Sequence, residues 1–548
     1  MTGSVASTIS SAYSQSDMAE KGGVRFKLIL FSLFISLFVA AMELSAISTS
    51  LPTIIDSLHG TDYVWVGTAY SLASTAFLPM SGGVAEIFGR RPAMIIALGL
   101  FALGSRTVQG LGGGAIQSVS SIIISDLVSL QERGTYNAVI GMAWAFASAI
   151  GPLVGGALAG RGQWRWLFYL NLPICGVAIV AVLIFLRLPT PPGTVTSKLR
   201  KMDWIGNLLV ISSTTAVVIG LSWGGVVYSW SSSHVLSTLI VGFVGFVLFF
   251  VHQAKWAANP IIPITILSNR SSVSGYIQNF INYILMLGLG YYFPVYLQAC
   301  KDASSIKSGL GILPLAASIG FSAVLSGISV TITKRYRPQL WVGWVLVAVG
   351  LGLITQLGPQ STYPHLLGVS VLPGIGMGVL AAVGYFPVLA PLNVTQNAYA
   401  LAFFAFGRTF AGIWGISLGN AVLQNELQKR LRPELVEALG GTITADKLYA
   451  FISQIRFLGE PTKAELQENF GDSLDVLWAV MAGVAGIGLL SSLLMKGIAL
   501  QNVRDEKWTK VEVAHGSDEE KNGVQGNTRD QEGEEDARSD RVGFEEVR

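Results

Sequence analysis

The chain has 548 residues, of which 51% are hydrophobic and only 13% are charged, and its mean hydropathy is +0.54. Because soluble proteins carry about 25% charged residues, this composition excludes a soluble globular fold and predicts a membrane protein. The net charge of +3 is too small and too scattered for a nucleic-acid partner. Cys175 and Cys300 lie in or beside apolar segments, so neither a disulfide framework nor a thiolate metal site is supported.

Apolar runs recur along most of the chain, and each is expected to be helical because the bilayer core offers no water to backbone amides. The first run follows a Ser-rich polar tail and is too long for the apolar core of a cleavable signal peptide. The sequence therefore predicts an all-α polytopic membrane protein. Its fourteen predicted spans centre on residues 28–50, 64–84, 93–105, 106–128, 137–159, 167–187, 204–222, 235–253, 273–297, 309–331, 339–357, 366–388, 398–423 and 474–497.

Lys and Arg gather in the short loops after the even-numbered spans, as at Arg90 and Arg91, which predicts a cytoplasmic N-terminus. The opposite loops near 56–63, 223–234 and 358–365 contain neither residue type. An even number of spans returns the C-terminus to the cytoplasm. The exceptions to the charge bias are Arg161, Arg165, Lys301 and Lys307.

Composition divides the chain into five parts. The tails, residues 1–25 and 498–548, are polar and are expected to be disordered and cytoplasmic, the second one acidic. Residues 26–187 form an N-terminal helical half, 188–253 a linker with two additional helices, and 254–497 a C-terminal helical half. The C-terminal helical half includes one long non-cytoplasmic loop at 424–473. In this loop, residues 435–439 and 448–452 are predicted to form short amphipathic helices.

The second span ends in GGVAEIFGRR, residues 82–91. Glycines let two helix ends approach, and acidic and basic residues can pair in one conformation and separate in another. A merely positive turn would explain the two arginines but not the glycine and acidic spacing. The motif resembles the loop between the second and third helices of the major facilitator superfamily. The resemblance implies a gate formed by Gly82, Glu86, Gly89, Arg90, Arg91 and, as a partner for Arg90, Asp126, with Glu86 where the family usually has Asp.

A second motif, RTVQGLGGGA at residues 106–115, is similar to the fourth-helix signature of proton-coupled members of that family. An arginine inside the membrane is costly, so Arg106 should face the protein interior and pair with an acid or a carbonyl group. The resemblance implies a role for Arg106 in proton coupling, and Gln109 is a candidate for the substrate cavity. No strand precedes the glycines and no Gly-Lys-Ser/Thr follows them, which argues against a phosphate loop.

MELSAISTSLP, residues 42–52, resembles the first-helix motif of the fungal fourteen-helix drug:proton antiporter branch, with Glu43 in the acidic position. Burial of a carboxyl group favours its protonated form, which suits a group that binds and releases protons. A Glu that only bonds within its own bundle is the alternative. WVGTAY (65–70) and WRWLFYLNLP (164–173) resemble the same branch, and the resemblance covers about 26–496.

Residues 141–156 are close to the fifth-helix antiporter signature, with Ala147 replacing one family glycine. Small residues on one face permit close helix crossing, and proline bends a helix. The members of this motif are Gly141, Gly151, Pro152, Gly155 and Gly156.

Asn279, Asn282 and Tyr283 place polar groups in the ninth span. They are candidates for the substrate cavity, although the amides can equally hold helices together. Arg408, in the thirteenth span, is expected to anchor its cytoplasmic end.

The resemblance implies a major facilitator fold of two six-helix halves plus two extra helices. It implies proton-coupled efflux of a drug, toxin or secondary metabolite by alternating access, not enzymatic catalysis. Its partners would be a small-molecule substrate, protons and the lipid bilayer. We expect a monomer without a cofactor, in the plasma membrane or, as an alternative, in the vacuolar membrane. Uptake of a nutrient or siderophore is a second hypothesis, and a non-transporting truncated isoform is a third.

The third hypothesis comes from the spacing of the two charged motifs. Only residues 92–105 separate them, whereas one crossing needs about 20 apolar residues. The spacing therefore predicts that part of a hairpin is missing near 105/106. We predict a shortened third and fourth helix pair and a protein that is poorly stable or inactive.

Overall fold

The computed structural model describes residues 23–58, 64–128, 130, 133–188, 193–225, 228–303, 305–358, 361–432, 435 and 452–500. These residues form helices and, apart from one isolated bridge, no β-structure. Ten helical segments within them are long and apolar enough to cross a membrane, which confirms the predicted fold class. The helices of the bundle are α2 (Val24–Leu58), α3 (Val64–Phe88), α4 (Arg90–Ala102), α5 (Arg106–Leu127), α6 (Arg133–Gly160), α7 (Trp166–Phe185), α9 (Trp204–Trp223), α10 (Ser233–Lys255), α11 (Arg270–Cys300), α13 (Leu313–Thr333), α14 (Arg337–Ile354), α15 (Tyr363–Val383), α17 (Asn397–Arg430) and α20 (Thr462–Leu493).

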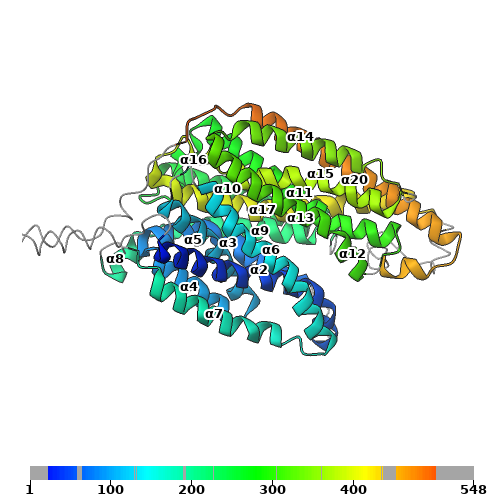
Figure 1. The fold of residues 1–548 in the computed structure, drawn as a ribbon, viewed down its shortest axis with the longest axis horizontal. Coiled ribbons are helices and arrows are strands. Elements are labelled where there is room, and N and C mark those ends of the chain that lie inside the picture. The colour runs from blue at the N-terminus through cyan, green and yellow to red at the C-terminus, as the bar shows by residue number, and fades with distance from the viewer. Residues whose placement is uncertain are drawn as a thin grey trace, which may run out of the picture. The chain divides into compact units, whose positions relative to one another are not determined.

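Helices α2 to α7 and helices α11 to α20 form two halves with the same internal pairing (Figure 1). In the first half α2 packs on α6, α3 on α5 and α4 on α7. In the second half α11 packs on α17, α13 on α15 and α14 on α20. The first and fifth, second and fourth, and third and sixth helices are thus paired twice, which is the signature of an internal repeat. The halves meet where α3 packs on α17 and α6 on α13.

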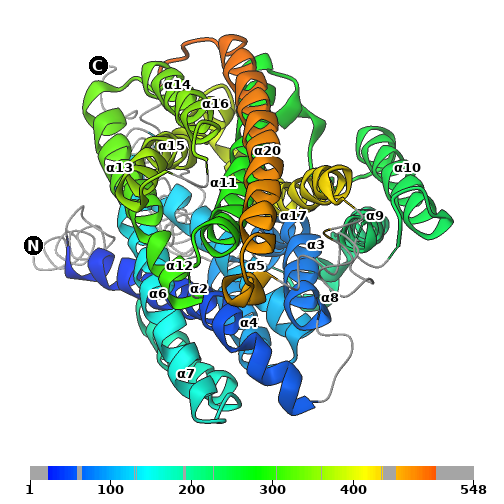
Figure 2. The same cartoon turned by 90° about the vertical axis from the view of Figure 1, so that its right-hand side faces the viewer.

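The two additional helices form a hairpin beside this bundle. Helix α9 packs on α10 and also contacts both α3 and α17, whereas α10 lies farther out (Figure 2). The outer surface of α10 is apolar, with Val247 63% exposed, for example. An apolar surface of this kind suits contact with lipid.

One carboxylate ties this hairpin together. Asp203 Oδ1 accepts a hydrogen bond from the backbone N–H of Gly206 at 2.8 Å and lies 3.0 Å from His252 Nε2. Its Oδ2 accepts from Gln253 Nε2 at 2.6 Å, and Gln253 Oε1 accepts from the backbone N–H of Ile262 at 3.1 Å. Asp203 therefore caps the start of α9 and fixes it to the end of α10.

Both helices that flank the predicted long loop extend into it, since α17 runs to Arg430 and α20 begins at Thr462. Most of the two short segments expected at 435–439 and 448–452, and most of both predicted tails, lie outside the described residues.

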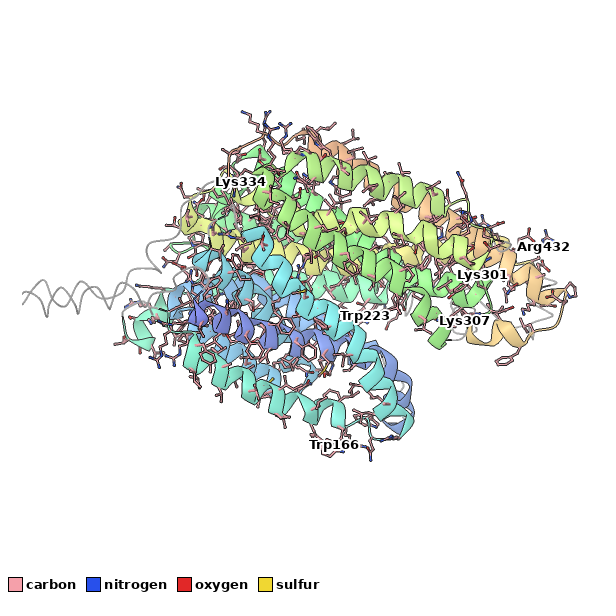
Figure 3. The ribbon with its side chains drawn as sticks, in the orientation of Figure 1. Trp166, Trp223, Lys301, Lys307, Lys334 and Arg432 are labelled. Atoms are coloured by element: carbon pink, nitrogen blue, oxygen red, sulfur yellow. The ribbon has the colours of Figure 1, made fainter. Side chains whose placement is uncertain are left out.

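Basic residues lie at both ends of the bundle. Lys334 lies at one end, and Lys301, Lys307 and Arg432 lie at the other (Figure 3). Three of the exceptions to the charge bias have local partners. The guanidinium carbon of Arg165 lies 4.4 Å from the centroid of the Trp164 ring. Lys301 Nζ donates to the Ser361 carbonyl oxygen at 2.6 Å, and Lys307 Nζ lies 5.4 Å from the centroid of the Tyr363 ring.

We predict that Asp203→Ala lowers the thermal stability of the purified protein, because the helix cap and both side-chain contacts are lost together. Loss of a cap costs about 1 kcal/mol, and each buried partner left unsatisfied costs about 1–3 kcal/mol. Asp203→Asn should cost less, since its carbonyl oxygen can still accept at the cap. Scanning fluorimetry in detergent measures both, with the exposed Lys198→Ala as control. Equal melting temperatures for Asp203→Ala and the wild type would contradict this role.

Candidate functional site

A buried ion pair joins three helices of the first half. Glu43, on α2, has a side chain that is only 1% exposed, and Arg106 is the first residue of α5. Arg106 Nη1 donates to Glu43 Oε1 at 3.0 Å. The other carboxylate oxygen accepts from Asn171 Nδ2, on α7, at 2.6 Å. Both oxygens of Glu43 are therefore held, each from a different helix.

Two further side chains complete the surroundings of Arg106. Gln109 Oε1, one turn along α5, accepts from Arg106 Nη1 at 2.7 Å. The Arg106 guanidinium also stacks on the ring of Tyr70, on α3, with its carbon 4.8 Å from the ring centroid. Gln109, expected in the substrate cavity, is thus fully buried against Arg106.

The glycines of α5 create this close arrangement. A β-carbon at Gly110 would collide with the backbone of Tyr70, and one at Gly113 would collide with its hydroxyl group. Only glycine allows the backbones of α3 and α5 to approach so closely. The motif that carries Arg106 therefore also brings α3 against it.

The arrangement can couple protonation to helix position. Inside a bilayer an arginine needs an anionic or carbonyl partner, so a proton on Glu43 would remove much of what holds Arg106 in place. The site also contains side-chain polar atoms that make no hydrogen bond in the described part of the chain. Gln109 Nε2 and Asn171 Oδ1 are buried and have no hydrogen-bond partner among the described residues.

Sequence reasoning did not single out Tyr70 or Asn171 as site residues. Both lie in stretches that resemble the antiporter branch, 65–70 and 164–173. A polar amide in the otherwise apolar α7 was the available signal, because such a group needs a partner.

A second cluster of charges lies where α3 and α4 meet. Arg90 is 1% exposed, and its Nε donates to Asp126 Oδ2, near the end of α5, at 2.8 Å. Its Nη1 donates to Glu86 Oε2 at 2.9 Å and to the Ala85 carbonyl oxygen at 3.0 Å. The structure thus brings together three of the residues predicted to form the gate.

Gly89 and Arg91 complete this turn. Gly89, with φ 95°, joins α3 to α4 in a conformation that side chains disfavour. Arg91 points elsewhere, because its Nη2 donates to the Leu183 carbonyl oxygen of α7 at 2.6 Å.

The hairpin of α4 and α5 is asymmetric. The contact of Arg90 with Asp126 joins the start of α4 to the end of α5, so the two helices run antiparallel. Helix α4 has 13 residues, about 20 Å at ~1.5 Å per residue, whereas α5 has 22. Because a turn at 103–105 directly precedes Arg106, that residue lies in the first turn of α5 and not in the middle of the helix. The shortening falls on α4.

In α6, the glycine motif packs against the helix that carries Glu43. A β-carbon at Gly151 would lie 2.6 Å from Ser45 Cβ, whereas one at Gly141 would meet open space. Gly155 is buried, and the side-chain surroundings of Pro152 and Gly156 lie outside the described residues.

The candidate residues in α11 mostly hold helices together. Asn279 Nδ2 donates to the Phe404 carbonyl oxygen of α17 at 2.9 Å, and Asn282 Nδ2 donates to that of Met377 in α15 at 3.4 Å. Tyr283 is half-buried, and the guanidinium carbon of Arg408 lies 5.0 Å from its ring centroid. Arg408 lies about three turns inside α17, not at its end, because α17 begins at Asn397.

Comparisons with known proteins agree with this architecture. Two curated fungal relatives are similar over nearly their whole length. The MFS-type efflux pump LUC4 of Fusarium sp is 37% identical, covering 93% of this chain and 94% of the relative. The efflux pump FUS6 of Gibberella fujikuroi is 36% identical, covering 88% of this chain and 91% of the relative. The alignment with LUC4 is 541 positions long, but it covers only 93% of the 548 residues of this chain. The alignment therefore includes positions at which LUC4 has a residue and this chain has none.

Solved structures share the fold at low sequence identity. The proton:xylose symporter XylE superposes with a TM-score of 0.53 at 14% identity, covering 87% of this chain and 97% of XylE. The human organic anion transporter MFSD10 superposes with a TM-score of 0.52, also at 14% identity, covering 86% of this chain and 100% of MFSD10. Residues 33–419 match the Major Facilitator Superfamily. The chain therefore belongs to the Major Facilitator Superfamily of membrane transporters.

Proposed function

We propose that this protein exports small organic molecules, drugs or secondary metabolites, by proton-driven alternating access. The observation that carries the proposal is the buried pair of Glu43 and Arg106, in which Asn171 occupies the second carboxylate oxygen. The full-length likeness to fungal efflux pumps supports the direction of transport. Antiport with protons, a monomeric state and a plasma-membrane location with both termini in the cytoplasm are parts of the same proposal.

In this mechanism Glu43 exchanges its bond to Arg106 for a proton. When Glu43 takes up a proton, the attraction to Arg106 falls and α5 is released from α2 and α7. When the proton leaves toward the cytoplasm, the pair forms again. Inward proton flow then drives outward movement of the substrate.

Contacts between the two halves support alternating access. Gly82 of α3 lies so close to α17 that a β-carbon there would sit 2.7 Å from Ala402 Cβ. Thr135 Oγ1 of α6 donates to Thr331 Oγ1 of α13 at 3.2 Å. Both contacts lie near the helix ends on the predicted cytoplasmic side, the side of Arg90. The halves are therefore closed on that side, which is one of the two states that alternating access requires.

The short α4 favours a second candidate interpretation, in which this chain is a truncated isoform that does not transport. About 20 Å of helix is shorter than a hydrocarbon core of about 30 Å. Polar backbone groups at 103–105 would then lie at membrane depth, where unsatisfied groups are costly.

The first prediction concerns coupling. Glu43→Gln should abolish flux driven by a pH gradient at saturating substrate while protein levels stay normal, because the amide cannot take part in proton exchange. Arg106→Ala should do the same. Arg106→Lys should retain part of the flux, since lysine keeps the charge but loses the planar fork of donors. Proteoliposomes loaded with a fluorescent dye measure the flux.

Glu426→Gln is the matched control for this experiment, because Glu426 also forms ion pairs but at the far end of α17. Undiminished pH-driven flux in Glu43→Gln would remove Glu43 from the mechanism. Equal flux in the Lys and Ala variants of Arg106 would argue against the fork geometry.

The second prediction concerns the closed side. Gly82→Val should push α3 and α17 apart at a cost of about 1–3 kcal/mol, whereas Gly83→Val, which meets open space, should not. Closure can be measured by oxidative cross-linking of a Thr135→Cys/Thr331→Cys pair. We expect the yield to fall with Gly82→Val only. An equal effect of both valines would assign the change to helix propensity instead.

The third prediction separates the two candidate functions. Inserting about 15–20 apolar residues after Ser105 should restore a full crossing and raise both the melting temperature and the pH-driven flux. An insert of the same length made of Gly and Ser should raise neither. Robust proton-driven flux by the unmodified chain, with no gain from the apolar insert, would refute the view that the short α4 limits the protein.

A further inference from the structure

We propose that Arg408 and Tyr283 form the binding site for the anionic group of the transported molecule. The substrate class is then a small organic acid with a planar, largely apolar body. This inference rests on the proposed export function and deepens it by naming the charge of the substrate.

Arg408 lies inside a helix that is long and apolar enough to cross a membrane, about 16 Å along α17 from Asn397. An arginine at such a position is rare and is expected to serve function, because its charge must be compensated in a poorly solvated environment. Arg408 is half-buried and is not sealed in the core.

Most of the other arginines that are buried or half-buried in the described helices have a polar partner. Among the described residues Arg337 also has only an aromatic neighbour, Trp341, but it is the first residue of α14, whereas Arg408 lies about three turns inside α17. Arg90 and Arg106 are each held by a carboxylate. Arg133 donates to the carbonyl oxygens of Ser125 and Val128. Within the described part of the chain, Arg408 has the Tyr283 ring as neighbour but neither a hydrogen bond nor an ion pair. The missing counter-charge is the feature that a bound anion would supply.

The pair is held on a rigid frame. Helices α11 and α17 are packed so closely that a β-carbon at Gly415 would collide with the backbone of Ile284, and one at Gly419 would collide with Tyr292. The hydrogen bond from Asn279 to the Phe404 carbonyl oxygen fixes the two helices one turn before the pair. Arg408 and Tyr283 thus keep their spacing without a ligand, which lowers the entropic cost of binding.

The chemistry of the pair suits a carboxylate or an enolate attached to a flat body. A guanidinium that stacks on a ring directs its N–H groups outward along its edge, where they can donate two parallel bonds to a carboxylate. Tyr283, Leu287 and Tyr291 are spaced at i, i+4 and i+8 and share one face of α11. Leu287 is 38% exposed and Tyr291 is 45% exposed, so this face offers apolar surface beside the cation.

The test compares two dyes that share a planar tricyclic body but differ in charge, fluorescein as the anion and rhodamine 123 as the cation. Their dissociation constants for the purified full-length protein are measured by fluorescence polarisation. We expect the wild type to bind fluorescein more tightly. Arg408→Gln should weaken fluorescein binding roughly tenfold or more and should not weaken binding of rhodamine 123.

Further variants test the geometry of the pair. Arg408→Lys should show an intermediate loss for fluorescein, because it keeps the charge without the fork. Tyr283→Leu should cost roughly threefold, whereas Tyr283→Phe, which keeps the ring, should cost little. Arg337→Gln is the matched control, since Arg337 also stacks on an aromatic ring, that of Trp341 at 4.8 Å, but at the start of α14. It should bind both dyes as the wild type does.

Three results would overturn the proposal: no fluorescein binding by the wild type, fluorescein binding that survives Arg408→Gln, or an equal loss for both dyes. Dye flux in proteoliposomes separates this proposal from the export function. Flux of rhodamine 123 without Arg408-dependent fluorescein binding would leave export standing and reject the anion site. Arg408-dependent fluorescein binding without flux of either dye would support the site and reject export by this chain.

Discussion

The high cost of a charge in the hydrocarbon core determines where the informative residues of this protein lie. Glu43 and Arg106 can both sit inside the bundle because each neutralises the other and because Asn171 satisfies the remaining carboxylate oxygen. Three helices must be in register for this pair to exist. A change in the protonation of one carboxyl group is therefore also a change in the forces between α2, α5 and α7.

Glycine residues allow the close helix contacts around the Glu43 and Arg106 pair and between the two halves. Gly113 lets α3 approach Arg106, Gly151 lets α6 approach the helix that carries Glu43, and Gly82 lets the two halves touch. Small residues bring helices close, and polar pairs then define which approach is stable. Close glycine contacts and polar pairs thus occur together both at the Glu43 and Arg106 site and where the two halves meet on the predicted cytoplasmic side.

Much of this could be predicted from the sequence. Hydropathy located all fourteen helices of the bundle, and motif spacing indicated that one hairpin was short. The start of α20 at Thr462 was not predictable by hydropathy, because its first turns carry Lys463, Glu465 and Glu468. Contacts between distant helices were also inaccessible. No local pattern shows that Asn171 reaches Glu43, or that Asn279 donates a hydrogen bond to a carbonyl oxygen of α17.

The position of α9 makes the two contact lines between the halves unequal. Along one line α3 meets α17 directly, and α9 touches both, with Leu221 accepting a hydrogen bond from Ser417 at 3.2 Å. Along the other line α6 meets α13. Any rotation of one half against the other must slide α9 along α3 or along α17, and Asp203 makes α10 follow. The hairpin of α9 and α10 thus restrains motion along the contact between α3 and α17. The two halves should therefore separate asymmetrically, with the larger displacement along the contact between α6 and α13.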